Sequence, residues 1–161
     1  MQTTMIPPTR LVVVDSYVLD AEKLLAGMDL NTRTLLVDRD EAALFQVVFT
    51  LAALAKENER PAALDFVTHG RPGAIFLGGR TIDVTAVEED ALLFGAIGKG
   101  LAPHGVVHLW SRDAGTGRAG RAFVNRLSRA IGRPVAGSPR RLGAGVPWTL
   151  DNGSRRAASE M

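Results

Sequence analysis

Two short apolar runs in this chain of 161 residues end in side chains that can take part in hydrolysis. The first, residues 64–68, leads into His69 and Gly70, and the second, residues 106–110, leads into Ser111. A histidine can move a proton in the transition state, and a serine hydroxyl becomes a nucleophile when a base activates it. The pattern therefore raises the hypothesis of a divergent hydrolase that uses Ser111 with His69.

The residues after Ser111 also suggest a binding site without catalysis. A serine nucleophile requires a base and preferably an orienting acid, which His69 and Asp113 could nominally supply. Arg112, between Ser111 and Asp113, cannot act as a nucleophile or base near neutral pH, but it can pair with Asp113 or present a cation to a carboxylate. We expect Gly70, Arg112 and Asp113 to be binding residues. The structural alternative for His69 is a strand-end histidine that is satisfied by a backbone carbonyl.

The elements that must position these residues alternate between strands and helices. Expected strands are residues 11–14, 34–37, 64–68, 106–110 and 134–136, and Gly78-Gly79 predicts a hairpin between 74–77 and 80–82. One expected helix carries Leu24, Leu25 and Met28; a second is capped by Asp40 and carries Leu44, Val47, Val48, Leu51 and Leu54. Two more helices are expected at about 85–99 and 115–131, the latter with Ala119, Ala122, Phe123, Leu127, Ala130 and Ile131 inward. The segment 142–150 could add a further hairpin.

This alternation favours a three-layer α/β sandwich with a mostly parallel sheet and a small β-hairpin after the third strand. We expect residues 1–9 to be a flexible arm, residues 10–150 to be a single domain and residues 151–161 to be a disordered tail. In such sheets, ligands bind beyond the carboxyl ends of the strands. That edge is where His69 and Ser111 are expected.

Composition excludes several classes of site. The chain has no cysteine, which rules out disulfides, thiolate metal sites and cysteine nucleophiles. No apolar stretch approaches the roughly 18 residues needed to span a bilayer, so no membrane insertion is expected. Pro7, Pro8 and Arg10 precede the first apolar run, unlike the order in a secretory signal. We expect a cytoplasmic protein, with export as part of a larger assembly as the alternative.

Positive charge is concentrated in the last third of the chain. The net charge is +2, but the segment from Arg112 onward carries ten arginines against Asp113, Asp151 and Glu160. Such polarity can mark a surface for nucleic acid or another anion. No aromatic residues are interleaved with these arginines, so a solvated arginine-rich face is favoured over a nucleic-acid surface.

Two further motifs resemble known sites. The glycines at 115, 117 and 120 have dinucleotide-fingerprint spacing, but residues 111–114 separate them from the preceding strand, which leaves no tight turn. Anion binding by the following helix start is the favoured alternative. His104 and His108 are four apart, but Pro103 and Gly105 preclude the helix that zinc ligation at this spacing needs. We therefore expect neither a metal nor a cofactor.

The order of features also resembles a known family. It includes Thr68-His69-Gly70, the hairpin at Gly78-Gly79, a helix, Pro103-x-Gly105 and a second apolar run. Asp15-Ser16, Leu25-Ala26-Gly27 and the segment Ala119–Val124 add to the likeness, which covers residues 11 to about 151. The chain resembles a bacterial domain family of unknown function that usually stands at the head of large repeat-containing surface proteins. That family is similar to the caspase, gingipain and clostripain group of cysteine peptidases.

The resemblance implies an active site that has lost its chemistry. His69 matches the dyad histidine of the peptidases, and Gly70 allows close backbone approach. In the related domains the fourth strand ends with a small residue and then cysteine, and here those positions hold Ser111 and Arg112. The resemblance implies a caspase-like domain whose histidine is vestigial. We expect a non-catalytic interaction module whose partner is a protein.

Overall fold

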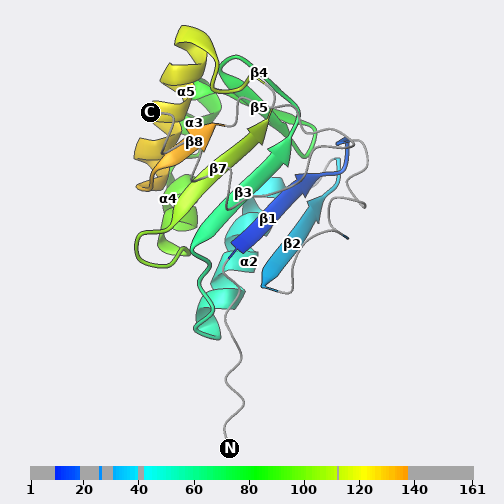
Figure 1. The fold of residues 1–161 in the computed structure, drawn as a ribbon, viewed down its shortest axis with the longest axis vertical. Coiled ribbons are helices and arrows are strands. Elements are labelled where there is room, and N and C mark those ends of the chain that lie inside the picture. Colours follow the sequence, from blue (N-terminus) through cyan, green and yellow to red (C-terminus); the bar gives the residue numbers. More distant parts are fainter. Residues whose placement is uncertain (1–9, 19–25, 27–30, 40–41, 112, 138–161) are drawn as a thin grey trace, which may run out of the picture.

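A five-stranded parallel sheet forms the centre of the molecule (Figure 1). The computed structural model describes residues 10–18, 26, 31–39, 42–111 and 113–137. The strand order is β2-β1-β3-β7-β8, and every neighbouring pair is parallel. The strands are β1 (Arg10–Asp15), β2 (Thr32–Val37), β3 (Ala63–Thr68), β7 (Val106–Ser111) and β8 (Val135–Gly137). All five agree with the expected strands to within two residues at each end.

Strand β3 lies at the middle of this sheet and is buried at all six residues. Its register places Phe66 beside Val13 of β1 on one side and beside Leu109 of β7 on the other. Side chains alternate between the two faces of a sheet, so these three residues point the same way. They join one apolar core with the helices. Asp65 and Val67 therefore point to the opposite face.

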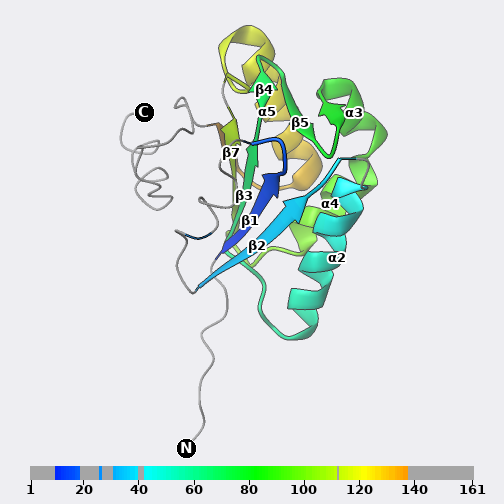
Figure 2. The same ribbon diagram turned by 90° about the vertical axis from the view of Figure 1, so that its right-hand side faces the viewer.

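Four described helices lie together on one side of the sheet (Figure 2). They are α2 (Ala43–Lys56), α3 (Val84–Glu89), α4 (Ala91–Lys99) and α5 (Gly117–Ile131). Helix α2 buries Leu44, Val47, Leu51 and Leu54, which are spaced three or four residues apart and so share one side of the helix. Helix α5 buries Phe123, Leu127 and Ile131 by the same rule. These inward positions confirm the predicted amphipathic pattern.

A small antiparallel sheet follows the third strand, as expected. It consists of β4 (Gly70–Arg71), β5 (Ala74–Leu77) and β6 (Arg80–Ile82), in that order. Gly78 and Gly79, both with positive φ, form the two-residue turn between β5 and β6. The prediction of a hairpin is confirmed, but the sheet has a third strand. That strand, β4, begins directly after His69, so the small sheet is attached to the end of β3.

The helix expected at residues 85–99 is in fact two helices, and that prediction is wrong. Asp90 has φ −106° and ψ 28°, which interrupts the helical backbone between α3 and α4. Its carboxylate lies 2.5 Å from an Arg80 guanidinium nitrogen. Asp83 caps α3 by accepting from the backbone N–H of Ala86. The apolar spacing continues across the break, which is why the sequence alone indicates one helix.

The expected inward orientation of Ala119 and Ala122 is also wrong, because both are exposed on α5. Five other expected features lie outside the described residues. They are the arm at 1–9, the helix with Leu24, Leu25 and Met28, the cap at Asp40, the hairpin at 142–150 and the tail at 151–161. The described helices account for one layer beside the sheet. None of them is long and apolar enough to cross a membrane.

Helices α4 and α5 pack closely at a glycine of α4. A Cβ added to Gly98 would lie 1.8 Å from the backbone oxygen of Ile131, whereas one added to Gly95 would lie 3.8 Å from that of Ala130. We expect Gly98→Ala to lower the free energy of unfolding by about 1–3 kcal/mol, because α5 must move away. Gly95→Ala is the control, and it should leave stability unchanged or raise it by up to about 1 kcal/mol through helix propensity. Urea unfolding compares the two variants, and equal effects would contradict this packing.

Candidate functional site

The carboxyl edge of the large sheet brings together the ends of β1, β3 and β7. The chain leaves β1 toward β2 and leaves β3 toward β7, so the connections diverge between the two adjacent strands β1 and β3. Open α/β sheets bind ligands at such a switch point. Tyr17 follows β1 and His69 follows β3, which places both residues there.

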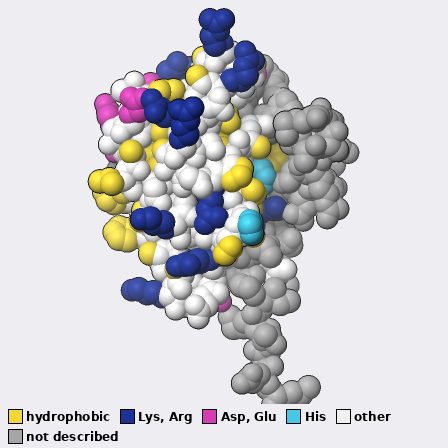
Figure 3. Space-filling view, turned by 90° about the vertical axis from the view of Figure 1, so that its left-hand side faces the viewer, with side chains coloured by type: hydrophobic (Ala, Val, Ile, Leu, Met, Phe, Trp, Pro, Cys, Tyr) yellow, Lys and Arg dark blue, Asp and Glu magenta, His cyan; other side chains and the backbone are white. Residues whose placement is uncertain are grey.

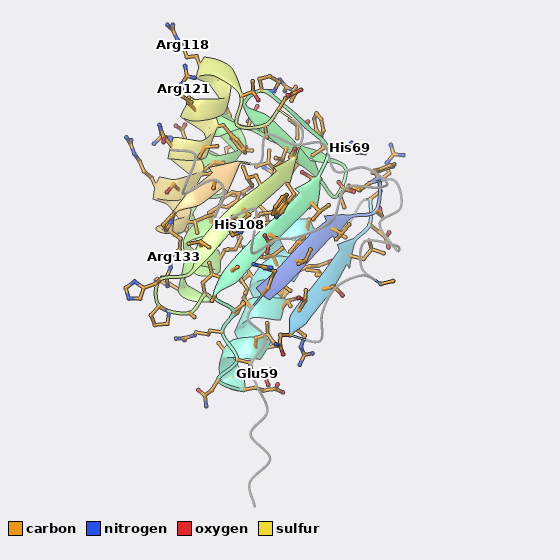
Figure 4. All side chains as sticks on the ribbon, viewed as in Figure 1. Glu59, His69, His108, Arg118, Arg121 and Arg133 are labelled. Carbon is orange, nitrogen blue, oxygen red and sulfur yellow. The ribbon has the colours of Figure 1, made fainter. Side chains whose placement is uncertain are left out.

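His69 contacts the segment after β1 (Figure 4). Its Nε2 lies 3.0 Å from the backbone oxygen of Tyr17. A carbonyl only accepts a hydrogen bond, so Nε2 carries the proton in this contact. The imidazole is otherwise exposed. His69 is thus a strand-end histidine that is hydrogen-bonded to a backbone carbonyl. This is the structural role that was expected as the alternative to a catalytic one.

Tyr17 itself is held by two further contacts. Its backbone N–H donates to a carboxylate oxygen of Asp15 at 3.1 Å, and Asp15 is buried at the end of β1. The guanidinium carbon of Arg39 lies 5.9 Å from the centre of the Tyr17 ring, within the range of a cation–π interaction. Tyr17 as a whole residue is 48% exposed to solvent. This part of the sheet edge therefore combines a fixed backbone with an accessible ring and cation.

Ser111 is directed away from His69. It is the last residue of β7 and pairs with Thr68 in register, on the face where Leu109 joins the helix-side core. Ser111 is 1% exposed, and its hydroxyl has no hydrogen-bond partner among the described residues. No hydrogen bond therefore joins the Ser111 hydroxyl to His69. The geometry lacks the nucleophile–base contact that serine catalysis requires.

Gly70 lies directly against this serine. A Cβ added to Gly70 would lie 2.1 Å from the Ser111 hydroxyl oxygen and 2.8 Å from the backbone oxygen of Ala74. Both distances are shorter than a Cβ tolerates. Glycine is therefore required by packing between β7 and the small sheet, in agreement with the close backbone approach expected at Gly70.

Of the two remaining expected binding residues, Arg112 and Asp113, the structure describes only Asp113. Arg112 lies outside the described residues. Asp113 is exposed and has φ 63°, a left-handed conformation that aspartate tolerates better than most residues. Its carbonyl accepts from the backbone N–H of Thr116, which turns the chain toward α5. The carboxylate of Asp113 thus lies at the surface of the carboxyl edge.

A buried polar cluster centred on Asp65 was not predicted from the sequence. Its carboxylate is fully buried in the middle of β3. One oxygen accepts from Trp110 Nε1 at 2.8 Å and from His108 Nδ1 at 3.0 Å. The other lies 3.1 Å from Arg10 Nε. All four side chains come from three adjacent strands, on the face opposite the described helices.

A signal for this cluster exists in the sequence. Residues 63–68 read Ala-Leu-Asp-Phe-Val-Thr, and a buried aspartate inside an apolar run needs a charged or hydrogen-bonding partner. His108 and Trp110 are two residues apart and so share one face of β7, where both contact Asp65. Their pairing with β3, however, depends on the strand register, which sequence alone does not give. Among the described residues, no group of three His, Asp or Glu side chains could hold a metal ion.

The fingerprint-like glycines serve packing in the described structure. A Cβ added to Gly120 would lie 2.2 Å from the carbonyl carbon of Gly115, so the loop presses against the first turns of α5. Gly117 has φ 70° at the start of the helix. Close packing explains Gly120, and the left-handed backbone conformation explains Gly117. Neither glycine requires a bound nucleotide.

Comparison with known proteins identifies the family of this domain. The model of the family described as domain of unknown function DUF4347 matches residues 11–161. The chain belongs to this family. The DUF4347 match includes every described strand of the large sheet apart from the first residue of β1. No curated protein and no solved structure matches the chain.

The Asp65 cluster should dominate the stability of this DUF4347 domain. We expect Asp65→Ala to lower the free energy of unfolding by about 3–5 kcal/mol, because His108, Trp110 and Arg10 would lose the buried carboxylate that they share. The control is Arg33→Ala, which removes the more exposed ion pair with Glu59 and should cost less than about 1 kcal/mol. Urea unfolding followed by tryptophan fluorescence measures both. A loss below 1 kcal/mol for Asp65→Ala would contradict a stabilising role.

Proposed function

We propose that this chain is a non-catalytic interaction module with a caspase-like, three-layer architecture, and that its partner is another protein. The observation that carries the proposal is the state of Ser111. Its hydroxyl is buried against Gly70 and has no base within hydrogen-bonding contact among the described residues. Serine chemistry requires an accessible hydroxyl beside a base.

The likeness to peptidases supports the architecture of the proposal. A parallel sheet carries His69 at the end of its third strand, followed by a small antiparallel sheet, in the order expected from the resemblance. The position expected to hold the nucleophile is Arg112 in this sequence. A guanidinium cannot replace a thiolate. The proposal therefore keeps the fold of the peptidase group and leaves out its reaction.

The carboxyl edge offers features that suit binding. Tyr17 presents a half-exposed ring beside Arg39. His69 and Asp113 are exposed just after the strands β3 and β7, which end at this edge. Aromatic and arginine side chains are enriched in protein interfaces, because they offer large contact areas with polar ends. We assign these residues to recognition.

A serine-reactive fluorophosphonate probe tests the proposal directly. We expect no labelling of the wild-type chain and no ester or peptide hydrolysis that depends on His69, because the Ser111 hydroxyl is inaccessible and unactivated. Mass spectrometry detects labelling, and a fluorogenic ester and peptide set detects turnover. Labelling at Ser111 that is lost in Ser111→Ala, or turnover that is lost in His69→Ala, would establish a hydrolase and overturn the proposal.

A further inference from the structure

Helix α5 has a strongly basic solvent-exposed side. Five arginines lie between Gly117 and Arg133, and the segment 114–137 contains no aspartate or glutamate. The side of the molecule on which α5 lies carries many Lys and Arg side chains, with acidic side chains near its margin (Figure 3). Charge of one sign on one helix indicates a surface that attracts an anionic partner.

Two of these arginines have structural roles. Arg126 forms an ion pair with Glu88 of α3. Arg133 donates to the backbone oxygens of Gly98 and Leu101 at the end of α4, at 3.2 and 3.3 Å. They tie α5 to the neighbouring helices and leave the remaining three arginines to be explained.

Arg118, Arg121 and Arg129 are exposed and form no hydrogen bond or ion pair with the rest of the described chain. Residues three or eleven positions apart lie on one side of an α-helix, so the three share a side that is about 16 Å long. Arg118 and Arg121 point away from the body of the protein (Figure 4). Arg118 lies in the first turn of α5, where the helix dipole opposes a cation, so its charge does not serve the stability of the helix. Arg129 lies in the last turn, where the dipole favours its charge.

The same exposed surface also contains small apolar side chains. Ala122 is exposed between Arg118 and Arg129, and Ala119 is exposed at the margin of this side, although the apolar pattern of α5 predicts that both face inward. The apolar surface of α5 is thus wider than the part that the domain buries. Alanines let a partner approach the helix backbone closely while guanidinium groups on either side reach its carboxylates.

The details favour an acidic protein segment over nucleic acid. Phe123, the aromatic residue of α5, is fully buried, so the helix offers no ring on which a base could stack. Glu88 and Glu89, exposed on the adjacent helix α3, are paired with Arg126 and Arg80, so unpaired positive charge does not continue from α5 over α3, as a long phosphate backbone would require. A short acidic segment can contact the arginines of α5 without reaching these carboxylates.

We propose that the exposed side of α5, formed by Arg118, Arg121 and Arg129 with Ala119 and Ala122, docks an acidic amphipathic segment of a partner protein. This inference rests on the proposed function as an interaction module and names the surface and chemistry of its partner. Carboxylates of the segment pair with the guanidinium groups, and its small apolar side chains cover the two alanines.

The test uses three fluorescein-labelled probes and measures binding by fluorescence anisotropy at low and physiological salt. One is a synthetic helical peptide with glutamates on one side and alanines on the other, the second is its lysine counterpart, and the third is a single-stranded DNA of mixed sequence. We expect the glutamate peptide to bind best, and Arg121→Glu and Arg129→Glu each to weaken it by about tenfold or more. Arg60→Glu makes the same charge change at an exposed site after α2 and should weaken binding less than twofold, as expected for a distant screened charge.

Each other outcome overturns the inference. Tighter binding of DNA than of the glutamate peptide, weakened by the same α5 variants, would assign the surface to nucleic acid. Equal losses in Arg60→Glu would show non-specific attraction, and absence of peptide binding would remove the docking surface. Circular dichroism confirms that the variants are folded. None of these results bears on Ser111, so failure here is distinct from fluorophosphonate labelling, which would overturn the proposed function itself.

Discussion

Strand β3 is buried at every residue and hydrogen-bonded in parallel to β1 and β7, and the arrangement of the site depends on this constraint. Alternation along the strand directs Leu64 and Phe66 to the helix-side core and directs Asp65 to the other face. Because a shift of one residue would exchange the two faces, the apolar core fixes the register strongly. The register in turn decides which side chains meet at the strand ends.

This register separates the two residues that could have formed a catalytic pair. Thr68 pairs with Ser111, so the serine hydroxyl faces the helix side and is covered by Gly70. His69, one residue later, reaches the carbonyl of Tyr17 at the switch point. In the middle of the same strand, Asp65 gathers Arg10, Trp110 and His108 across three strands. The polar interactions of β3 thus hold the sheet together, and its end presents groups suited to recognition.

Much of the fold could be predicted from local patterns. Apolar runs located all five strands of the sheet, and Gly78-Gly79 located the hairpin, because these signals reside in a few consecutive residues. The break at Asp90 could not be predicted, since the apolar spacing continues across it from α3 to α4. The exposure of Ala119 and Ala122 was missed because periodicity gives the direction of an apolar face but not how much of it neighbouring elements cover.

The candidate site was predicted in its residues but not in their relations. The sequence predicted that His69 and Ser111 follow adjacent strands. In the structure Ser111 pairs with Thr68, so His69 lies one residue further along and its side chain contacts a different partner. The Asp65 cluster combines residues more than forty positions apart. No local pattern encodes such a cluster. Only the buried aspartate itself gave a signal, because a carboxylate in a core strand must be paired.

The protonation pattern of the His69 imidazole tests the central claim most directly. Long-range ¹H–¹⁵N NMR spectra of the wild-type chain and of Ser111→Ala report which ring nitrogen carries the proton in the neutral form. The claim that Tyr17, and not Ser111, holds the histidine predicts a proton on Nε2 and an unchanged spectrum in the variant. A proton on Nδ1, or a shift of the His69 ring signals on removal of the Ser111 hydroxyl, would couple the two residues and contradict a non-catalytic site.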